Sequence, residues 1–207
     1  MVGKASRTRY AILQHAADRA SMDGLEGLTI GSLASDLQMS KSGLFAHFGS
    51  KEDLQLAVVE HAAARFAEEI VAPAQQAPAG GERLRAYCEH YLDHLEHSVF
   101  AGGCFWAAAA CEFDDRPGAV RDAIADGVRV WLAELERQAR LAGLPRPAEV
   151  AFEIYSLGLG ANACTRLLHD TRAFALTRAT IQQLLAARAT TINGEPPASR
   201  VNLRAGE

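Results

Sequence analysis

The stretch that most constrains the fold is residues 29–53, TIGSLASDLQMSKSGLFAHFGSKED. Thr29 and Ser40 are residue types that favour the position just before a helix, and each precedes a short run with apolar residues at helical spacing. Ala34 is small, as a residue must be where two short helices cross closely. The pattern predicts two short helices joined by a tight turn, followed by a longer helix that begins near Lys51.

The outward face of the second short helix is small and polar. Leu44, Phe45 and Phe48 are expected to face the core or its edge. The residues left outside are Lys41, Ser42, Gly43, Ala46 and His47. Such a face fits the major groove of DNA, which is about 12 Å wide. Glycine costs about 1 kcal/mol in a helix interior relative to alanine, so close approach to a duplex is a reason for Gly43.

The charge of the chain excludes a general polyanion-binding protein. Its 207 residues carry a formal net charge of −4, whereas such a protein shows a broad basic excess. In the first 20 residues four cations face one anion, a local net charge of +3, and these are Lys4, Arg7, Arg9, Arg19 and Asp18. Acidic residues gather further on, as at 112–115. This asymmetry indicates a basic head on an acidic body.

Helical periodicity continues through the rest of the chain, and no useful run alternates with period two. Glycine and proline mark the breaks. We therefore predict an all-α protein of about nine helices, at roughly 6–22, 29–36, 40–47, 51–72, 82–97, 104–113, 118–142, 147–169 and 172–190. The expected domains are a DNA-binding head at 1–50, a helical body at 51–190 and a polar, frayed tail at 191–207.

Two absences in the sequence bear on where the protein works. The sequence has no stretch of about 18 consecutive apolar residues and no signal-peptide pattern, so neither a membrane span nor secretion is expected. The four cysteines, Cys88, Cys104, Cys111 and Cys164, match no zinc-binding spacing. A chain of this length needs no disulfide to fold, so we expect a reducing cytoplasm.

Residues 7–55 resemble the DNA-binding domain of the TetR/AcrR family of transcriptional regulators. The matching segments are LEGLTI at 25–30, LA at 33–34, SKSGLF at 40–45, HF at 47–48 and SKEDL at 50–54. Two positions depart from the family pattern. Gln38 stands at the turn position usually taken by glycine, where a left-handed conformation is tolerated at some cost. Phe45 stands where tyrosine is usual, so a hydroxyl that family members use on phosphate is missing.

The resemblance implies an all-α fold with an N-terminal helix-turn-helix, homeodomain-like three-helix domain and a C-terminal helical ligand-binding and dimerisation domain. It implies that Lys41, Ser42 and Gly43 lie against base edges, and that His47 lies at the edge of the groove. The DNA-binding candidates are Thr29, Ser40, Lys41, Ser42, Gly43, Phe45, His47 and Lys51.

Backbone contacts are assigned by the same resemblance. Thr29, at a helix N-terminus, and Lys51, just before the fourth helix, are expected to bind phosphate. Lys4, Arg7 and Arg9 are expected to add contacts from a flexible arm. For any single surface lysine or arginine, an ordinary solvated charge is the competing interpretation, and Thr29 is a helix cap first.

The body is expected to form a homodimer, because helix-turn-helix proteins usually match two half-sites of a palindromic operator. Helix 147–169 is apolar almost all round, and its small residues, Gly158, Gly160, Ala161 and Ala163, favour close approach of another helix. In the resembled family the last two helices pair with their copies as a four-helix bundle. The alternative is that both are core helices of a monomer.

The resemblance also implies a repressor that releases DNA when a small, largely apolar molecule enters the body. The ligand-binding candidates are Tyr87, Tyr91, Cys104, Phe105, Trp106, Trp131, Phe152, Tyr155 and Asn162. Aromatic clusters at helical spacing are more often plain core, which is the competing interpretation. No cofactor and no resident metal are expected.

Three alternatives stay open at the level of sequence. His90, His94 and His97 share one helix face, a geometry a metal could use, although that face is expected to be solvated. Cys104, at a helix start, is the cysteine best suited to thiol sensing. A helical adaptor without DNA function is the third. An enzyme is not expected, because no nucleophile–base pair or phosphate-binding glycine loop is found, and 112–115 looks like a solvated helix end.

Overall fold

The computed structural model describes residues 4–97 and 99–191, and all of its regular elements there are helical. They are α1 (Lys4–Asp23), α2 (Ile30–Asp36), α3 (Lys41–Phe48), α4 (Lys51–Phe66), the π-helical segment η1 (Ala67–Val71), α5 (Ala72–Ala74), α6 (Gly81–Glu96), α7 (Phe105–Phe113), α8 (Ala119–Leu141), α9 (Pro147–Leu168) and α10 (Ala173–Thr191). Because α4, η1 and α5 are continuous, this part of the chain forms nine separate helices, so the predicted all-α fold is confirmed. Beyond Thr191, the predicted polar tail lies outside the described residues.

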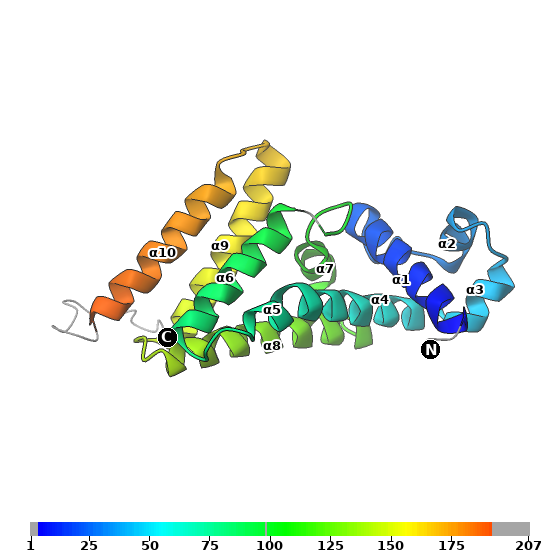
Figure 1. Ribbon diagram of the computed structural model, residues 1–207. Coiled ribbons are helices and arrows are strands. Elements are labelled where there is room, and N and C mark those ends of the chain that lie inside the picture. The colour runs from blue at the N-terminus through cyan, green and yellow to red at the C-terminus, as the bar shows by residue number, and fades with distance from the viewer. Residues whose placement is uncertain (1–3, 98, 192–207) are drawn as a thin grey trace, which may run out of the picture.

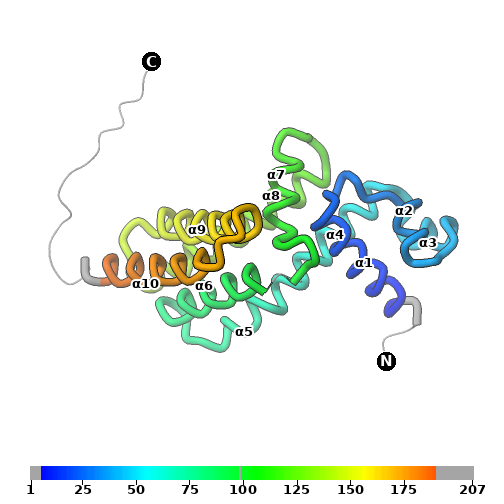
Figure 2. Tube along the Cα trace, turned by 90° about the horizontal axis from the view of Figure 1, so that it is seen from above, coloured from blue at the N-terminus to red at the C-terminus, as the bar shows by residue number. Residues whose placement is uncertain are grey.

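The helices form an elongated molecule with the head at one end (Figure 1). Helices α1, α2 and α3 make up the head, and α4 leads out of it along the length of the body beside α8. At the far end α6, α9 and α10 stand together, and α7 lies between them and the head (Figure 2). Among the described helices, none is both long enough and apolar enough to cross a membrane.

Two hydrophobic clusters form the core, and the first does not stop at residue 50. It joins Leu33 and Leu44 of the head to Leu54 on α4, Phe105 on α7 and Ile124 on α8. The second cluster lies in the body between α6, α8, α9 and α10. The head expected at 1–50 is therefore packed continuously onto the first half of α4 and onto α7.

The π-helical segment interrupts the helix predicted at 51–72. Pro73 follows it, and proline within a helix lacks an N–H and clashes with the carbonyl four residues earlier. That carbonyl belongs to Glu69, inside the wider π turn, where the N–H of Ala72 bonds to the carbonyl of Ala67. We attribute the position of η1 to Pro73.

Candidate nucleic-acid interface and ligand cavity

Side-chain caps hold the two short helices of the head. The Thr29 hydroxyl accepts a hydrogen bond from the N–H of Ser32 at 3.0 Å, and the Ser32 hydroxyl accepts one from the N–H of Thr29 at 3.4 Å. The Ser40 hydroxyl accepts a bond from the N–H of Gly43 at 3.0 Å. Between the two helices Gln38 has a φ of 53°, the left-handed conformation expected of it. The predicted helix-turn-helix is confirmed.

The outward face of α3 differs from the prediction at one residue. Leu44 and Phe48 are buried as expected, but Phe45 is 54% exposed. Its ring joins the exposed Lys41, Ser42 and Ala46, with Gly43 and His47 half-buried at the margin. Phe45 lies three residues after Ser42, so the two side chains are neighbours on one helix face. An aromatic ring therefore belongs to the surface that the head presents.

Gly43 has a reason within the chain itself. A Cβ at this position would lie 2.9 Å from the Ser40 hydroxyl oxygen, closer than real Cβ atoms come. The same oxygen caps α3 by accepting the bond from the N–H of Gly43. The position of the capping oxygen therefore disfavours a side chain at residue 43. From the sequence alone, the approach of a DNA duplex was the expected reason for this glycine.

Lys51 forms an ion pair with another residue of the head. Its ammonium lies 2.7 Å from a carboxylate oxygen of Glu26, and the side-chain amide of Gln55 binds the same carboxylate. The hydrogen bond from Lys51, then that from Gln55, lowers the pKa of Glu26. The Lys51 side chain is still 42% exposed, so it reaches the surface with its charge partly compensated.

Arg9 is not part of a flexible arm, and that prediction is wrong for both Arg7 and Arg9. Both lie within α1. The Arg9 guanidinium donates to the carbonyl of His47 at 3.0 Å and lies 4.7 Å from the centroid of the Phe48 ring. Arg9 therefore fastens the end of α3 to α1. The side chain of Lys4 lies outside what the structure describes.

One contact between the head and the body was not predicted from the sequence. The Glu112 carboxylate, on α7, accepts hydrogen bonds from the N–H of Leu25 at 2.7 Å and from the N–H of Glu26 at 3.1 Å. Nearby, the N–H of Gly102 donates to the Ser21 hydroxyl at 2.8 Å. The prediction that 112–115 is only a solvated helix end is wrong at Glu112, because its partners lie 86 and 87 residues away in the sequence.

The body contains a cavity of about 610 Å³. Its walls come from α4 and η1, from α6 and α8, and from Trp106 and Tyr155 on α7 and α9. The ligand-binding candidates that line it are Tyr87, Tyr91, Cys104, Trp106, Trp131 and Tyr155. Its volume is within the range of small-molecule sites.

Aromatic rings dominate these walls. The centroid of the Trp131 ring lies 5.0 Å from Phe66, 5.4 Å from Tyr87 and 5.5 Å from Tyr91, and the first two contacts are edge-to-face. Aromatic pairs prefer this geometry, and it fixes the rings relative to one another. The cavity therefore has a rigid aromatic wall from three helices.

One end of the cavity carries a closed polar network. The Tyr87 hydroxyl donates to Glu134 at 3.0 Å, Arg137 donates to both oxygens of that carboxylate at 2.8 and 2.9 Å, and Gln138 adds a bond at 2.8 Å. Burial, then the Glu134 contact, raises the pKa of Tyr87 to about 12. Burial opposes ionisation of Glu134, but the three donors lower its pKa overall.

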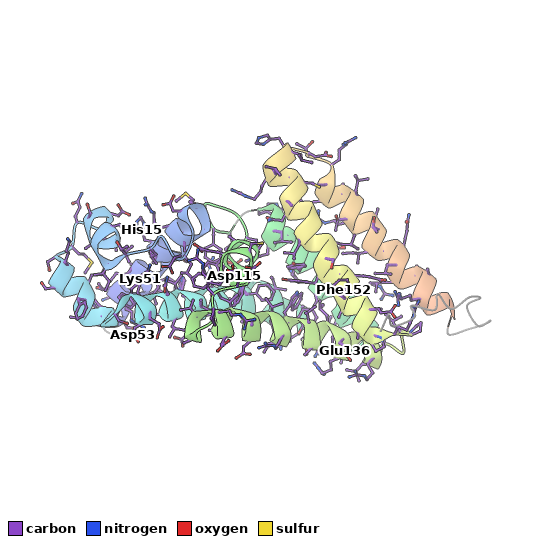
Figure 3. All side chains as sticks on the ribbon, turned by 180° about the vertical axis from the view of Figure 1, so that it is seen from behind. His15, Lys51, Asp53, Asp115, Glu136 and Phe152 are labelled. Carbon is purple, nitrogen blue, oxygen red and sulfur yellow. The ribbon has the colours of Figure 1, made fainter. Side chains whose placement is uncertain are left out.

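Three ligand-binding candidates lie elsewhere. Phe105 is buried in the first core cluster. Phe152 is 66% exposed on α9, at the opposite end of the molecule from Lys51 (Figure 3). Asn162 does not line the cavity, although its buried side-chain oxygen has no hydrogen-bond partner. Helical spacing did not reveal which side of each helix faces the cavity.

A shallow groove runs between α9 and α10. Apolar side chains along it include Phe152, Leu157, Leu176 and Leu184, and beyond the groove Leu167 and Leu168 are also exposed. Gly160 lies in the groove with nothing within 4 Å of a Cβ built there. Gly158, in contrast, is buried against Tyr91 of the same chain, so it is not available to a partner helix as the sequence suggested.

The thiol and metal alternatives find little geometric support. Burial raises the pKa of the Cys104 thiol, whereas a thiol sensor needs a thiolate. His94 is buried beside Glu69, with 2.8 Å between its Nδ1 and a carboxylate oxygen, so the expectation of a solvated histidine face is wrong there. In the described part of the chain, no group of three histidine, cysteine or acidic side chains could hold a metal ion.

A capped helix-turn-helix head, packed onto a helical body with an aromatic cavity, is the architecture of a transcriptional regulator with a ligand-binding domain. The chain belongs to the TetR family. Residues 12–58 match the family model described as bacterial regulatory proteins of the tetR family, and residues 80–181 match the tetracyclin repressor-like C-terminal domain. The resemblance is thereby confirmed, and membership identifies a DNA-binding regulator rather than an enzyme.

Solved structures share the fold over nearly the whole chain. A TetR-family regulator from Cytophaga hutchinsonii is 21% identical, with 91% of this chain and 98% of that chain covered and a TM-score of 0.77. One from Chloroflexus aurantiacus is 22% identical, with 92% and 96% covered and a TM-score of 0.76. AibR, solved with isovaleryl coenzyme A and operator DNA, is 25% identical, with 84% and 97% covered and a TM-score of 0.69. No protein of curated function matches the chain by sequence.

Proposed function

We propose that the chain is a cytoplasmic, homodimeric repressor that binds a palindromic operator and releases it when a small, largely apolar molecule fills the cavity. One observation carries the proposal: α4 belongs to both sites. Leu54 and Val58 lie in the core of the head, while Phe66 at the end of α4 lines the cavity, followed by Ala67 and Val71 of η1. A change in the cavity therefore acts on the helix that supports the head.

Helix α7 supplies a second connection between cavity and head. Trp106 in its first turn lines the cavity, and Glu112 in its last turn holds the N–H groups of Leu25 and Glu26. A molecule that fits the cavity only when Trp106 or Phe66 shifts prefers a different head position. Such a difference in affinity is what moves the equilibrium away from the DNA-binding state.

DNA contacts are proposed from the surface of the head. Lys41, Ser42 and Gly43 at the start of α3 are assigned to base edges, with His47 at the groove edge and Phe45 as an apolar contact beside Ser42. The backbone of the caps at Thr29 and Ser40, together with Lys51, is assigned to phosphate. Lys41 is exposed and has no ion-pair partner among the described residues, so its charge is available for a contact with DNA.

Homodimerisation is proposed through α9 and α10. Their outward surfaces carry Phe152, Leu167, Leu168 and Leu176, each at least 60% exposed. A twofold interface uses one patch twice, and apolar residues gathered on two adjacent helices suit it. Two heads on one dimer match two half-sites about one turn of DNA apart.

AibR bears on the proposal only by analogy. Its printed description gives a complex with isovaleryl coenzyme A and with operator DNA. At 25% identity, this supports an effector and an operator as the two ligands of such a chain, and it does not identify either of them here.

Selection of bound sequences from random DNA tests the proposal. The full chain should enrich a palindrome at low salt, and Lys41→Ala should weaken enrichment or change the sequence. Arg140→Ala, on the exposed surface of α8, removes one cation from the part of that helix that packs in the body cluster and should leave the palindrome unchanged. Enrichment without a palindrome contradicts the twofold model, and no enrichment at all contradicts DNA recognition and favours a helical adaptor.

A further inference from the structure

The cavity carries its own counter-charge. Among the residues that line it, only Glu134 and Arg137 are charged, and they are bonded to each other through both carboxylate oxygens. Tyr87 and Gln138 complete the set of donors to Glu134. Each charge already has a bidentate partner in the wall, so a ligand ion would have to compete with that partner for it.

The other ionisable wall residues are neutral near pH 7. Burial raises the pKa of the hydroxyls of Tyr87, Tyr91 and Tyr155 and of the Cys104 thiol, so each keeps its proton. The walls therefore carry no net charge. An ion that leaves water for such a site loses hydration without gaining a counter-ion, which costs several kcal/mol.

The apolar surface that remains is mostly aromatic. Phe66, Tyr87 and Tyr91 surround Trp131, and Trp106 and Tyr155 complete the aromatic lining. Ring faces and edges favour a flat aromatic partner over a branched aliphatic one. The hydroxyls of Tyr91 and Tyr155 have no hydrogen-bond partner in the described part of the chain, so they can serve a polar atom of the ligand.

We infer that the effector is an uncharged molecule built on a planar aromatic ring system, with a neutral oxygen such as a carbonyl or hydroxyl for the two free tyrosine hydroxyls. The inference rests on the proposed function, since it names the ligand class of the same cavity. It adds a charge requirement that a merely apolar cavity does not impose.

Three dyes of similar size test it by fluorescence titration of the full chain. Nile red is neutral and carries a carbonyl, Nile blue is a cation with the same fused ring system, and anilinonaphthalene sulfonate is an anion. Nile red should bind at least about tenfold more tightly than either ion, because only the ions lose uncompensated hydration. Binding of either ion as tight as that of Nile red overturns the inference, and so does failure of all three dyes to bind.

Two substitutions test the cause. Glu134→Gln leaves Arg137 without its partner and should raise the affinity for the anionic dye, relative to that for Nile red, by about tenfold. Arg137→Gln should raise the relative affinity for the cationic dye by a similar factor. The matched controls are Glu136→Gln and Arg140→Gln, which break the neighbouring ion pair on α8 outside the cavity. They should leave the order of the dyes unchanged. An unchanged order in Glu134→Gln and Arg137→Gln, with folding verified by circular dichroism, contradicts charge compensation as the basis.

The DNA selection described above separates this inference from the proposed function. It is performed without any dye, so enrichment of a palindrome together with tight binding of an ionic dye overturns the ligand class alone. If the dye-free selection enriches no sequence while Nile red binds the same protein in the titration, the regulator model is overturned and the charge requirement of the cavity stands.

Discussion

Gly127 stands in the middle of α8, where alanine favours the helix by about 1 kcal/mol over glycine. A Cβ at this position would lie 2.4 Å from Cη2 of Trp106, so the glycine makes room for an aromatic residue of the cavity wall. The helix preference of the residue has given way to the packing of the ring. The absence of a side chain at Gly127 thus lets the Trp106 ring pack directly against α8.

Replacement of that glycine should therefore destabilise the protein. Gly127→Ala is expected to lower the free energy of unfolding by about 1–2 kcal/mol, because overpacking outweighs the gain in helix propensity. Urea unfolding at one fixed protein concentration measures it. Gly81→Ala is the control, since the nearest atom to its Cβ would be an ordinary 3.8 Å away. Equal unfolding free energies for Gly127→Ala and wild type would contradict the packing argument.

A substitution at Phe45 is expected to strengthen DNA binding. Phe45→Tyr adds a hydroxyl to an exposed ring on α3 and should tighten operator binding by at least about tenfold, because one hydrogen bond to a charged acceptor is worth about 1.5–3 kcal/mol. Fluorescence anisotropy on the selected operator, at constant salt, measures it. Phe45→Leu removes the ring and should weaken binding. An unchanged affinity in Phe45→Tyr would mean that the ring does not lie near phosphate.

Among the features of single residues, those that depend on residues close in the sequence could be predicted from it. The caps at Thr29 and Ser40 and the left-handed turn at Gln38 involve residues no more than a few positions apart, and all three were predicted. The pairing of Lys51 with Glu26 spans 25 residues, and no local pattern indicates it. Distant partners are chosen by the fold, which the sequence does not display.

Among the elements, α7 connects the two halves of the molecule by its last turn. Glu112→Ala should leave the N–H groups of Leu25 and Glu26 without acceptors and lower the free energy of unfolding by about 1–2 kcal/mol, since both hydrogen bonds are only partly buried. Hydrogen exchange at those two amides should accelerate more than the global change explains. Asp115→Ala, exposed in the same acidic run (Figure 3), is the control and should alter neither quantity.

Two buried histidines on neighbouring elements make stability depend on pH. Burial, together with the charge of Arg65, lowers the pKa of His61 on α4. Burial also lowers the pKa of His94 on α6 and outweighs the bond to Glu69. The unfolded chain therefore binds protons more readily, so the stability from these residues is complete above their unfolded pKa and is lost as pH falls through the folded pKa.

The melting temperature should accordingly fall as the pH is lowered from 7 to 5. His94→Gln keeps a donor for Glu69 without titrating, so its melting temperature should fall less over the same range. His90→Gln replaces a histidine of α6 that is less buried and serves as the control. Parallel pH profiles for His94→Gln and wild type would show that His94 does not contribute to the acid limb. Differential scanning calorimetry in a matched buffer series gives both profiles.

Element boundaries were predicted closely except around η1. The periodicity of 51–72 indicates one helix, and the chain is indeed helical throughout. Apolar spacing cannot distinguish a π turn from an α turn over five residues, and Pro73 lies just beyond the predicted helix. The cavity likewise was predicted as a set of aromatic residues, but Phe105 and Phe152 lie outside it because the direction of each side chain depends on how the helices are packed.

For the whole molecule, the prediction is that DNA binding requires the dimer. Leu176→Asp places a charge in the groove of α9 and α10 and should give a monomer at micromolar concentration, with operator binding lost in parallel. Analytical ultracentrifugation and anisotropy measure the two. Leu141→Asp, an exposed leucine at the end of α8, should change neither. A dimeric Leu176→Asp, or a monomer that still binds the palindrome tightly, would contradict the proposed interface.

The self-neutralised pair of Glu134 and Arg137 makes the two binding equilibria respond differently to ionic strength. Operator affinity falls steeply as salt rises, because binding to DNA releases condensed counter-ions. Entry of an uncharged molecule into a cavity of zero net charge releases none. At higher salt the affinity for the operator falls while the affinity for the effector does not, so less effector is needed to release the DNA. The effector concentration at which this regulator responds would thus shift with the ionic strength of its surroundings, with no change in any residue that touches the effector.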